Sequence, residues 1–346
     1  MGTEAFQNIL LIQLRRIGDV LMTTPSIRAL RHAFPDAHIT FLTEAPSDQV
    51  LKHNPFLNKV LVIRRKSPLS TYLKFLWELR KMNFDLVIDF FSNPRSAQIS
   101  WFSGALRRIG FNFPGRGFFY TDRIALGGEK YAAEHKSLLL KELGIEVDSW
   151  ALDFHISDSD RLYAEQLFQQ MGLQSVDFVV SISPVSRQPY KVWPPDRYAQ
   201  IADNLIERYD AKILFIYGPG EIIFVDQVRQ YMKHTALPDY DIPSLSQTKA
   251  IFEKVQLHIG NDNGPCHFAI SAGIPTVTVF GRPKAVNWNP PGQSRHCAVE
   301  YDPGCKNDCQ FPHCEHLNCI NGIQAETVKN AVFHSIDQFQ LGKPYV

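Results

Sequence analysis

NILLIQLRRIGDVLMTTPSIRALRHAF, residues 8–34, indicates the fold of the first half of this chain. Its first seven residues form a mostly apolar run with branched side chains, which is typical of a parallel strand buried on both faces. A turn containing Gly18 and Asp19 follows, and the rest of the stretch has a helical pattern. A buried strand that passes through a glycine turn into a helix is the first unit of a doubly wound sheet, whose ligands lie where the strands end.

Strand and helix patterns alternate along the chain, which predicts an α/β protein with parallel sheets. In the first half we expect strands at residues 9–14, 38–43, 60–63, 86–90 and 108–111, and helices at residues 70–81, 92–103, 134–143 and 158–171. The alternation restarts with expected strands at residues 178–182, 213–217, 257–259 and 276–280, a helix at residues 195–208 and an amphipathic tail at residues 325–339. We therefore predict two Rossmann-like domains, residues 1–172 and 173–325, followed by a C-terminal helix in residues 326–346.

Length and charge are consistent with two domains that bind different partners. The chain has 346 residues, enough for two hydrophobic cores. Residues 1–150 contain 20 Lys and Arg and 14 Asp and Glu, a net charge of +6, whereas residues 151–346 contain 16 and 21, a net charge of −5. This split is either ordinary surface variation or a sign that the first half binds something anionic.

Two observations favour a cytoplasmic location. No apolar stretch reaches the ~18 residues of a membrane-spanning helix, and Glu4 stands where a signal peptide carries basic residues. In a reducing compartment the six cysteines are not expected to form disulfides. Four of them, Cys305, Cys309, Cys314 and Cys319, are spaced more loosely than the paired cysteines of zinc ribbons, so we expect no metal there, although a structural metal is the alternative.

The acid at the end of the first strand has two interpretations. Asp19 is either a helix-start residue favoured by the helix dipole or a base that accepts a proton from a substrate. A dinucleotide site is disfavoured because the turn has only Gly18 in place of three glycines. Arg15 and Arg16 precede this acid, and we expect their charges to favour its ionised form.

Residues suited to a nucleotide follow three expected strands of the second half. In SPVSRQPYKVW, residues 183–193, the side chains of Ser186, Arg187 and Lys191 can donate to phosphate oxygens, while Trp193 is expected in the core. Glu221 follows Gly-Pro-Gly and either accepts ribose hydroxyls or starts a helix.

A further group of such residues occurs in GNDNGPCHFAISAGIPTVTVFG, residues 260–281. The group consists of Asp262, Asn263, Gly264 and His267. The helix expected after the glycine offers free N–H groups to an anion. A lone histidine is usually an ordinary core residue, but His267 lies within one turn of the Asp-Asn-Gly sequence, which favours a functional role.

Residues 10–35, the Lys-x-Trp loop and residues 260–281 together resemble the ADP-heptose:lipopolysaccharide heptosyltransferases, glycosyltransferase family nine. The resemblance extends from about residue 8 to residue 325, and the cysteine-rich stretch that ends in Cys-Ile-x-Gly-Ile is also similar. It implies a GT-B fold, in which two Rossmann-like doubly wound domains face each other across a cleft and a C-terminal helix crosses back to the first. It also implies an inverting enzyme that transfers L-glycero-D-manno-heptose from ADP-heptose to the inner core of lipopolysaccharide at the cytoplasmic face of the inner membrane.

The resemblance also suggests roles for residues. Asp19 matches the general base, Lys191 the ligand of the donor phosphates, and Glu221 a ribose contact, while Asp262, Asn263, Gly264 and His267 match the donor-binding loop. A phosphorylated or Kdo-bearing acceptor would suit the basic first half, with Arg15, Arg16, Arg64, Arg65, Lys66 and Arg116 as its expected ligands. No cofactor, nucleic acid or obligate protein partner is expected, and contact with the inner membrane would be peripheral.

Two other functions compete with this interpretation. Another nucleotide-sugar transferase or an epimerase could use the same fold, and tests with different donors would distinguish them. A non-catalytic module whose cysteine loop binds metal and nucleic acid is less consistent with the sequence, because the basic residues are not in the half that contains the cysteines.

Overall fold

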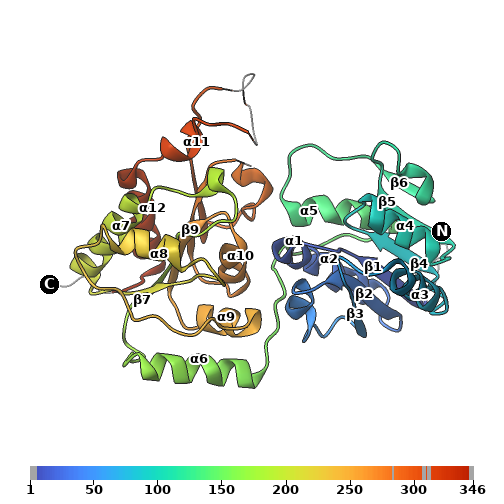
Figure 1. Cartoon of the computed structure of the whole chain (residues 1–346), viewed down its shortest axis with the longest axis horizontal. Coiled ribbons are helices and arrows are strands. Elements are labelled where there is room, and N and C mark those ends of the chain that lie inside the picture. Colours follow the sequence, from blue (N-terminus) through green and yellow to red (C-terminus); the bar gives the residue numbers. More distant parts are fainter. Residues whose placement is uncertain (1–5, 283, 306–308, 310–312, 343–346) are drawn as a thin grey trace. The chain divides into compact units, whose positions relative to one another are not determined.

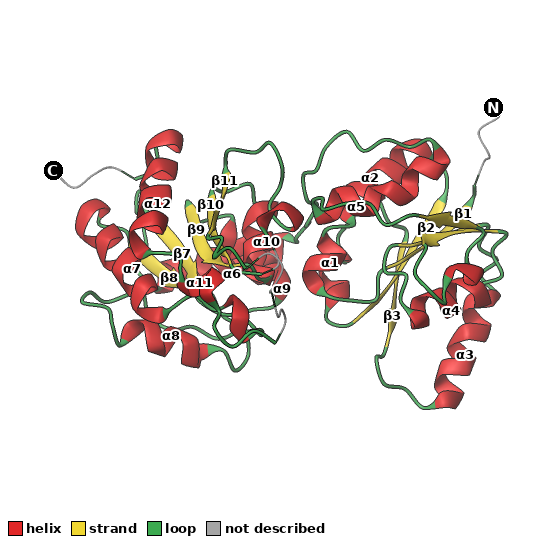
Figure 2. Cartoon of the chain, turned by 90° about the horizontal axis from the view of Figure 1, so that it is seen from above, coloured by secondary structure: helices red, strands yellow, loops and turns green. Residues whose placement is uncertain are grey.

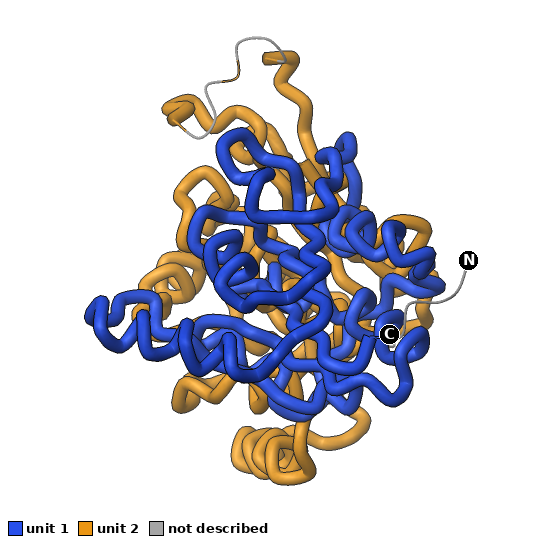
Figure 3. Tube along the Cα trace, turned by 90° about the vertical axis from the view of Figure 1, so that its right-hand side faces the viewer, with its two compact units in different colours: residues 1–155 blue, residues 156–346 orange. Residues whose placement is uncertain are grey.

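The computed structural model of the protein describes residues 6–282, 284–305, 309 and 313–342 (Figure 1). The chain divides into two compact units, residues 1–155 (unit 1) and residues 156–346 (unit 2), which Figure 3 colours separately. Each unit is an α/β doubly wound parallel sheet, as the sequence predicts. The division falls between residues 155 and 156, whereas the strand and helix patterns place it between residues 172 and 173.

The sheet of unit 1 has six strands in the order β3-β2-β1-β4-β5-β6, all parallel. They are β1 (Asn8–Ile12), β2 (His38–Glu44), β3 (Lys59–Ile63), β4 (Leu86–Asp89), β5 (Arg107–Phe111) and β6 (Asp122–Ile124). The strand order reverses between β1 and β4. In open α/β sheets this switch point is where ligands bind, outside the carboxyl ends of the strands.

Helices cover both faces of this sheet, which explains why its central strands are buried on both sides. The α-helices are α1 (Ile17–Leu21), α2 (Thr24–Ala33), α3 (Leu69–Arg80), α4 (Pro94–Phe102) and α5 (Ala132–Ser137), and short 3₁₀ helices are η1 (Ser47–Leu51), η2 (Gly117–Phe119) and η3 (Leu138–Leu143). On one face, Ile27 and Leu30 of α2 pack with Ile9 and Leu11. On the other, α3 and α4 pack against the alternate residues of the same strands.

The sheet of unit 2 has five parallel strands in the order β11-β10-β9-β7-β8. They are β7 (Val179–Ser183), β8 (Lys212–Phe215), β9 (Leu257–Asn261), β10 (Thr276–Phe280) and β11 (His296–Glu300). Read in chain order this is the 2-1-3-4-5 arrangement, so the switch point lies between β7 and β9. The Lys191 loop follows β7 and the Asp262 loop follows β9, which places both at that point.

The helices of unit 2 again lie on both faces of the sheet (Figure 2). They are α6 (Asp158–Gln170), α7 (Pro195–Tyr209), α8 (Ile222–Arg229), α9 (Leu245–Phe252), α10 (Gly264–Ser271), α11 (Asn318–Asn321) and α12 (Ala325–Phe339), with 3₁₀ helices η4 (Pro189–Lys191) and η5 (Ala285–Asn287). The tail helix has the expected bounds, and Val328, Val332 and Ile336 bury its apolar face in the core with α7 and α8.

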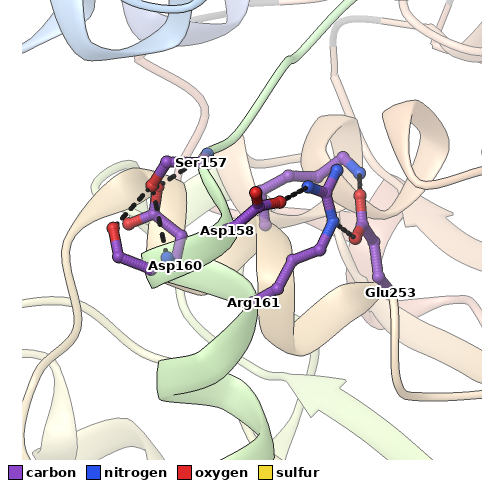
Figure 4. Close-up of polar contacts among 7 residues, drawn as sticks. Ser157, Asp158, Asp160, Arg161 and Glu253 are labelled. Carbon is purple, nitrogen blue, oxygen red and sulfur yellow. Dashed lines mark hydrogen bonds and ion pairs between the residues drawn. The ribbon is translucent and has the colours of Figure 1, made fainter.

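Helix α6 belongs to unit 2, where it packs against α9 and where an ion pair joins its first turns to the residue after α9. The Ser157 hydroxyl caps the helix by accepting the Asp160 N–H at 3.3 Å. Arg161 then lies between two carboxylates, with N–O distances of 3.2 Å to Asp158 and 3.3 Å to Glu253, the residue that follows α9 (Figure 4). These contacts explain why the division of the chain precedes α6.

Candidate active site

Asp19 lies in the first turn of α1, directly after β1. Its Oδ2 accepts the Arg16 backbone N–H at 3.2 Å, which is the contact of a helix-start acid. In the described part of the chain the other oxygen, Oδ1, has no hydrogen bond. One oxygen therefore fixes the carboxylate at the strand end, and the second is available to a ligand.

A lysine from a distant helix interacts electrostatically with Asp19. Among the described residues, neither Arg15 nor Arg16 forms an ion pair with this carboxylate. Lys136 of α5 is the cation that interacts electrostatically with Asp19 and with Asp89. Burial lowers the pKa of Lys136, and the two carboxylates partly oppose that shift.

Lys136 is connected to the loop that carries Asp19. Its ammonium group is buried and donates to Gln13 Oε1 at 2.7 Å. The amide nitrogen of Gln13 in turn donates to the Arg15 carbonyl at 2.5 Å. This chain of contacts supports the β1–α1 loop from α5. Sequence reasoning missed Lys136 because it lies more than 100 residues away, in a helix whose pattern gives no sign that this lysine is buried.

A second carboxylate, that of Asp89, is buried at the end of β4 across the switch point. Tyr120 Oη donates to its Oδ2 at 2.7 Å, and the Ser92 N–H donates to its Oδ1 at 2.9 Å. Burial raises the pKa of Asp89, and these hydrogen bonds oppose the rise. Arg116 donates to the Ser92 carbonyl at 2.9 Å, so this expected acceptor ligand lies at the same edge of the sheet.

The basic segment after β3 is held by an arginine that sequence reasoning did not select. Arg95, in the first turn of α4, donates to Glu44 Oε1 at 2.9 Å and to the carbonyls of Arg64 and Arg65 at 2.8 and 3.1 Å. The side chains of Arg64, Arg65 and Lys66 are exposed. All six expected acceptor ligands therefore lie in segments at the carboxyl edge of the sheet of unit 1. Glu44 ends β2, so the strand-end rule applied to that strand would have found it.

In unit 2, Lys191 lies on a loop that is fixed on both sides. Trp193 is fully buried, as predicted; its backbone N–H donates to Asn261 Oδ1 at 3.1 Å and its indole N–H donates to the Ile323 carbonyl at 2.9 Å. On the other side, a Cβ on Gly281 would lie 3.0 Å from the Tyr190 carbonyl oxygen. A side chain at residue 281 would therefore crowd the loop where it approaches the end of β10.

Lys191 forms an ion pair with Asp262, which follows β9. Nε2 of His267 lies 3.9 Å from the other Asp262 oxygen. The ring of Trp288 lies 5.7 Å from the His267 ring, and its centroid lies 6.0 Å from Lys191 Nζ. The switch point thus brings together a cation, an acid, an imidazole and an indole. Trp288 was missed because it lies in a loop after η5, with no motif around it.

Asn263 and Gly264 begin α10. The side-chain Oδ1 of Asn263 caps the helix by accepting the Cys266 N–H at 3.0 Å, and its Nδ2 donates to Ser183 Oγ and to the Val185 carbonyl at 3.0 and 2.9 Å. Both ends of this side chain thus serve the fold. Around Gly264, in contrast, a Cβ would meet no atom within 4 Å. The start of α10 therefore offers space for a ligand beside its backbone N–H groups.

The remaining expected donor ligands lie in neighbouring loops. Ser186 is buried, and its hydroxyl accepts the Gln188 N–H at 3.2 Å, whereas Arg187 is exposed. Glu221 precedes α8, and its Oε2 accepts the Gly218 N–H at 2.8 Å. The structure thus gives Glu221 a turn-closing contact, and its contact with a ribose stays a prediction.

The cysteine loop is only partly described. Residues 306–308 and 310–312 lie outside the described residues, and the metal-free state expected for Cys305, Cys309, Cys314 and Cys319 stays a prediction. Within the residues that are described, no three His, Cys, Asp or Glu side chains are grouped as metal ligands. In the same part of the chain, no helix combines the length and apolar character that crossing a bilayer requires.

Comparison with known proteins agrees with this geometry. A sequence model of glycosyltransferase family 9 (heptosyltransferase) matches residues 72–315. The chain is 27% identical to lipopolysaccharide heptosyltransferase 3 of Escherichia coli K12 over 80% of its own length and 83% of that protein.

Two solved structures have the same fold. A family 9 glycosyltransferase from Veillonella parvula superposes with a TM-score of 0.83 at 25% identity, covering 96% of this chain and 97% of that one. The E. coli ADP-heptose lipopolysaccharide heptosyltransferase II superposes with a TM-score of 0.75 at 18% identity, covering 96% and 100%. The two doubly wound sheets and the family match lead to one conclusion: this chain is a glycosyltransferase and belongs to family 9, the heptosyltransferases.

Proposed function

We propose that the protein transfers L-glycero-D-manno-heptose from ADP-heptose to a sugar hydroxyl of the inner core of lipopolysaccharide, with inversion at the anomeric carbon. Membership of family 9 supports this, as do the names of the E. coli relatives, which state lipopolysaccharide as substrate and, for one of them, ADP-heptose. The observation that carries the proposal is the group formed by Lys191, Asp262, His267 and Trp288 beside the open start of α10.

In this proposal the donor binds unit 2. The Lys191 ammonium and the N–H groups at the start of α10 stabilise the negative charge that develops on the diphosphate as it leaves. Asp262 holds Lys191 in position, and Trp288 provides a flat apolar surface next to it. The other donor ligands are Ser186, Arg187, Glu221, Asn263, Gly264 and His267, with Asn263 acting through the backbone because its side chain is used within the fold.

The acceptor binds unit 1, where Asp19 acts as the general base. The acceptor hydroxyl loses its proton to the Asp19 carboxylate while its oxygen forms a bond to the anomeric carbon of the heptose. The bond from that carbon to the phosphate oxygen breaks, and its electron pair leaves with ADP. A single displacement of this kind inverts the anomeric centre. The available oxygen of Asp19, Oδ1, is the one that takes up the proton.

The anionic groups of the acceptor bind the basic edge of unit 1. Guanidinium groups bind phosphates and carboxylates in bidentate geometry. The proposed ligands are Arg15, Arg16, Arg64, Arg65, Lys66 and Arg116. Such an acceptor is anchored in lipid, so the enzyme would act at the cytoplasmic face of the inner membrane, through peripheral contact. No cofactor takes part.

The experiment that tests the proposal is turnover with purified donors and acceptors. We expect heptose transfer from ADP-heptose to a truncated core acceptor, little transfer from UDP-sugars, and release of one ADP per product. Turnover of a UDP-sugar without ADP-heptose activity would instead identify another transferase or an epimerase. Stoichiometric zinc in protein purified without added metal would contradict our expectation that the cysteine loop holds no metal.

A further inference from the structure

Helix α3 exposes an apolar stripe to solvent. Leu69, Leu73 and Trp77 recur every fourth residue along one face, and their exposed fractions are 72%, 53% and 61%. Leu76 and Leu79, which lie next to this stripe around the helix, are buried in the core of unit 1. The solvent-exposed part of such a helix is normally polar, whereas here the apolar face extends beyond the buried residues into solvent. Contiguous exposed apolar groups usually mark a binding surface.

A second apolar group lies beside the end of this helix. Trp101 and Phe102 end α4 with their rings in edge contact at 5.0 Å, and Leu106, which follows, is 88% exposed. Arg80 connects the two groups, since its guanidinium donates to the Phe102 carbonyl at 3.3 Å. α3 and α4 lie side by side (Figure 2), so Leu69, Leu73, Trp77, Trp101, Phe102 and Leu106 form one surface, which we call the α3–α4 surface.

Basic side chains surround this surface. Residues 64–81 contain six exposed cations and a single acid, Glu78. The cations are Arg64, Arg65, Lys66, Lys74, Arg80 and Lys81. The ammonium of Lys81 lies 3.1 Å from the centre of the Trp77 ring, so a positive charge lies directly against the indole. Tryptophan and lysine side chains together are typical of the boundary between lipid headgroups and acyl chains.

We propose that the α3–α4 surface is where this enzyme binds a bilayer that contains anionic phospholipid. The apolar side chains enter the outer part of the acyl region, and the cations bind the lipid phosphates. This proposal rests on the proposed function and adds the site of membrane contact to it. The same loop that begins α3 carries Arg64, Arg65 and Lys66, so a membrane bound here places the basic acceptor ligands at the lipid surface, where a lipid-anchored acceptor presents its sugars.

Charge favours a membrane over a second copy of the chain as the occupant. A symmetric dimer would bring the same surface of each subunit together. Six cations would then face six cations with only Glu78 from each side to oppose them, and like charges in an interface are costly. An anionic lipid surface attracts the same cations.

The test is flotation of the full-length protein with two kinds of vesicle. We expect binding to vesicles of phosphatidylethanolamine and phosphatidylglycerol, weakened by salt, and little binding to phosphatidylcholine vesicles. The double variant Leu73→Ser/Trp77→Ser should bind the anionic vesicles at least about tenfold more weakly, because membrane binding scales with the apolar area buried. The matched control is Ile223→Ser on α8, which removes an apolar side chain of similar exposure, 58%, from unit 2.

A water-soluble acceptor separates this proposal from the proposed function. With a delipidated core oligosaccharide, the double variant should retain wild-type turnover, while turnover of the acceptor in anionic vesicles should fall. Vesicle binding by the double variant equal to that of the wild type, or an equal loss in Ile223→Ser, would overturn the proposal. So would a wild-type dimer that the double variant converts to a monomer. If the wild-type enzyme transferred heptose to none of the acceptors, the proposed function would be refuted, but the flotation result would still stand.

Discussion

Replacing Lys191 by methionine should weaken both the donor site and unit 2, and the structure separates the two effects. Methionine keeps the length of the apolar stem but removes the charge. The Asp262 side chain is 5% exposed and that of Lys191 is 17% exposed, so the variant leaves a buried carboxylate without its cation. Breaking a buried ion pair by removing one partner costs roughly 3–5 kcal/mol. Because solvent reaches the lysine, we expect a loss of about 2–3 kcal/mol in the free energy of unfolding.

The loss of affinity for ADP should be of a similar size. A hydrogen bond from an ammonium group to a phosphate contributes roughly 1.5–3 kcal/mol, so the dissociation constant for ADP should rise roughly 10- to 150-fold. Isothermal titration calorimetry measures this change, and urea denaturation of the same protein measures the change in stability.

The double variant Lys191→Met/Asp262→Asn distinguishes the two effects. Asparagine removes the unpaired charge, so the double variant should regain most of the lost stability, because replacing both members of a buried pair is far less costly than removing one. Its affinity for ADP should stay low, since the ammonium is still absent. Wild-type affinity for ADP in Lys191→Met, together with the expected loss of stability, would show that Lys191 is a structural residue and would refute the donor assignment.

Three further predictions follow from other parts of the molecule. Burial lowers the pKa of His258 to about 3, so the imidazole is neutral in the folded state, whereas in the unfolded state it takes up a proton near pH 6.5. The contribution of this histidine to the free energy of unfolding is therefore complete above pH 6.5 and falls by about 2 kcal/mol between pH 7 and pH 5. Burial also lowers the pKa of His296, to about 4, so the wild type has a second source of acid loss. Urea denaturation at both pH values should therefore show a loss that is smaller by about 2 kcal/mol in His258→Asn than in the wild type or in the exposed control His234→Gln; an unchanged acid loss in His258→Asn would contradict the assignment. Lys136→Met should lower kcat and shift the pH profile of kcat with little change in ADP affinity, because Lys136 acts through the loop that carries Asp19. An unaltered pH profile would show that Lys136 serves only in packing. The KM for an anionic acceptor should rise with salt more steeply than the KM for ADP-heptose, because exposed charges are screened over about 10 Å at 0.1 M salt, and equal salt sensitivity would contradict electrostatic binding of the acceptor.

The sequence predicted the sheets well because parallel strands buried on both faces have an unmistakable pattern. Residues 9–12 form a continuous apolar run, and residues 276–280 consist of β-branched and aromatic side chains; both stretches lie in buried strands. β6 and β11 were missed for the opposite reason. β6 is a three-residue edge strand that contains two charged residues, and β11 is an edge strand with partly exposed side chains. Neither has the apolar pattern from which strands were recognised.

The candidate site was predictable where its residues follow strands, and not where contacts are distant in sequence. Asp19, Lys191 and Asp262 were selected because the carboxyl ends of parallel strands meet at one edge. Lys136, Arg95 and Trp288 reach the same edges from helices and loops that no local pattern connects to them. Asn263 was selected as a donor ligand, but its side chain already forms hydrogen bonds within unit 2. Its oxygen caps α10, and its nitrogen donates to two neighbouring groups.

The role of Asp19 is the central claim, and Asp19→Asn tests it most directly. Asparagine can still accept the Arg16 N–H that holds the side chain in place, so the fold and the start of α1 should change by only a fraction of a kcal/mol. The carboxylate that takes the proton is lost, and a positioned base contributes about 10²- to 10⁴-fold to turnover. We therefore predict that kcat for transfer from ADP-heptose falls by about 10²-fold or more, while calorimetric affinity for the donor, whose ligands lie in unit 2, stays within a few-fold. A well-folded Asp19→Asn protein that retains more than about a tenth of the wild-type kcat would contradict the account, because the loss would be too small for general-base catalysis.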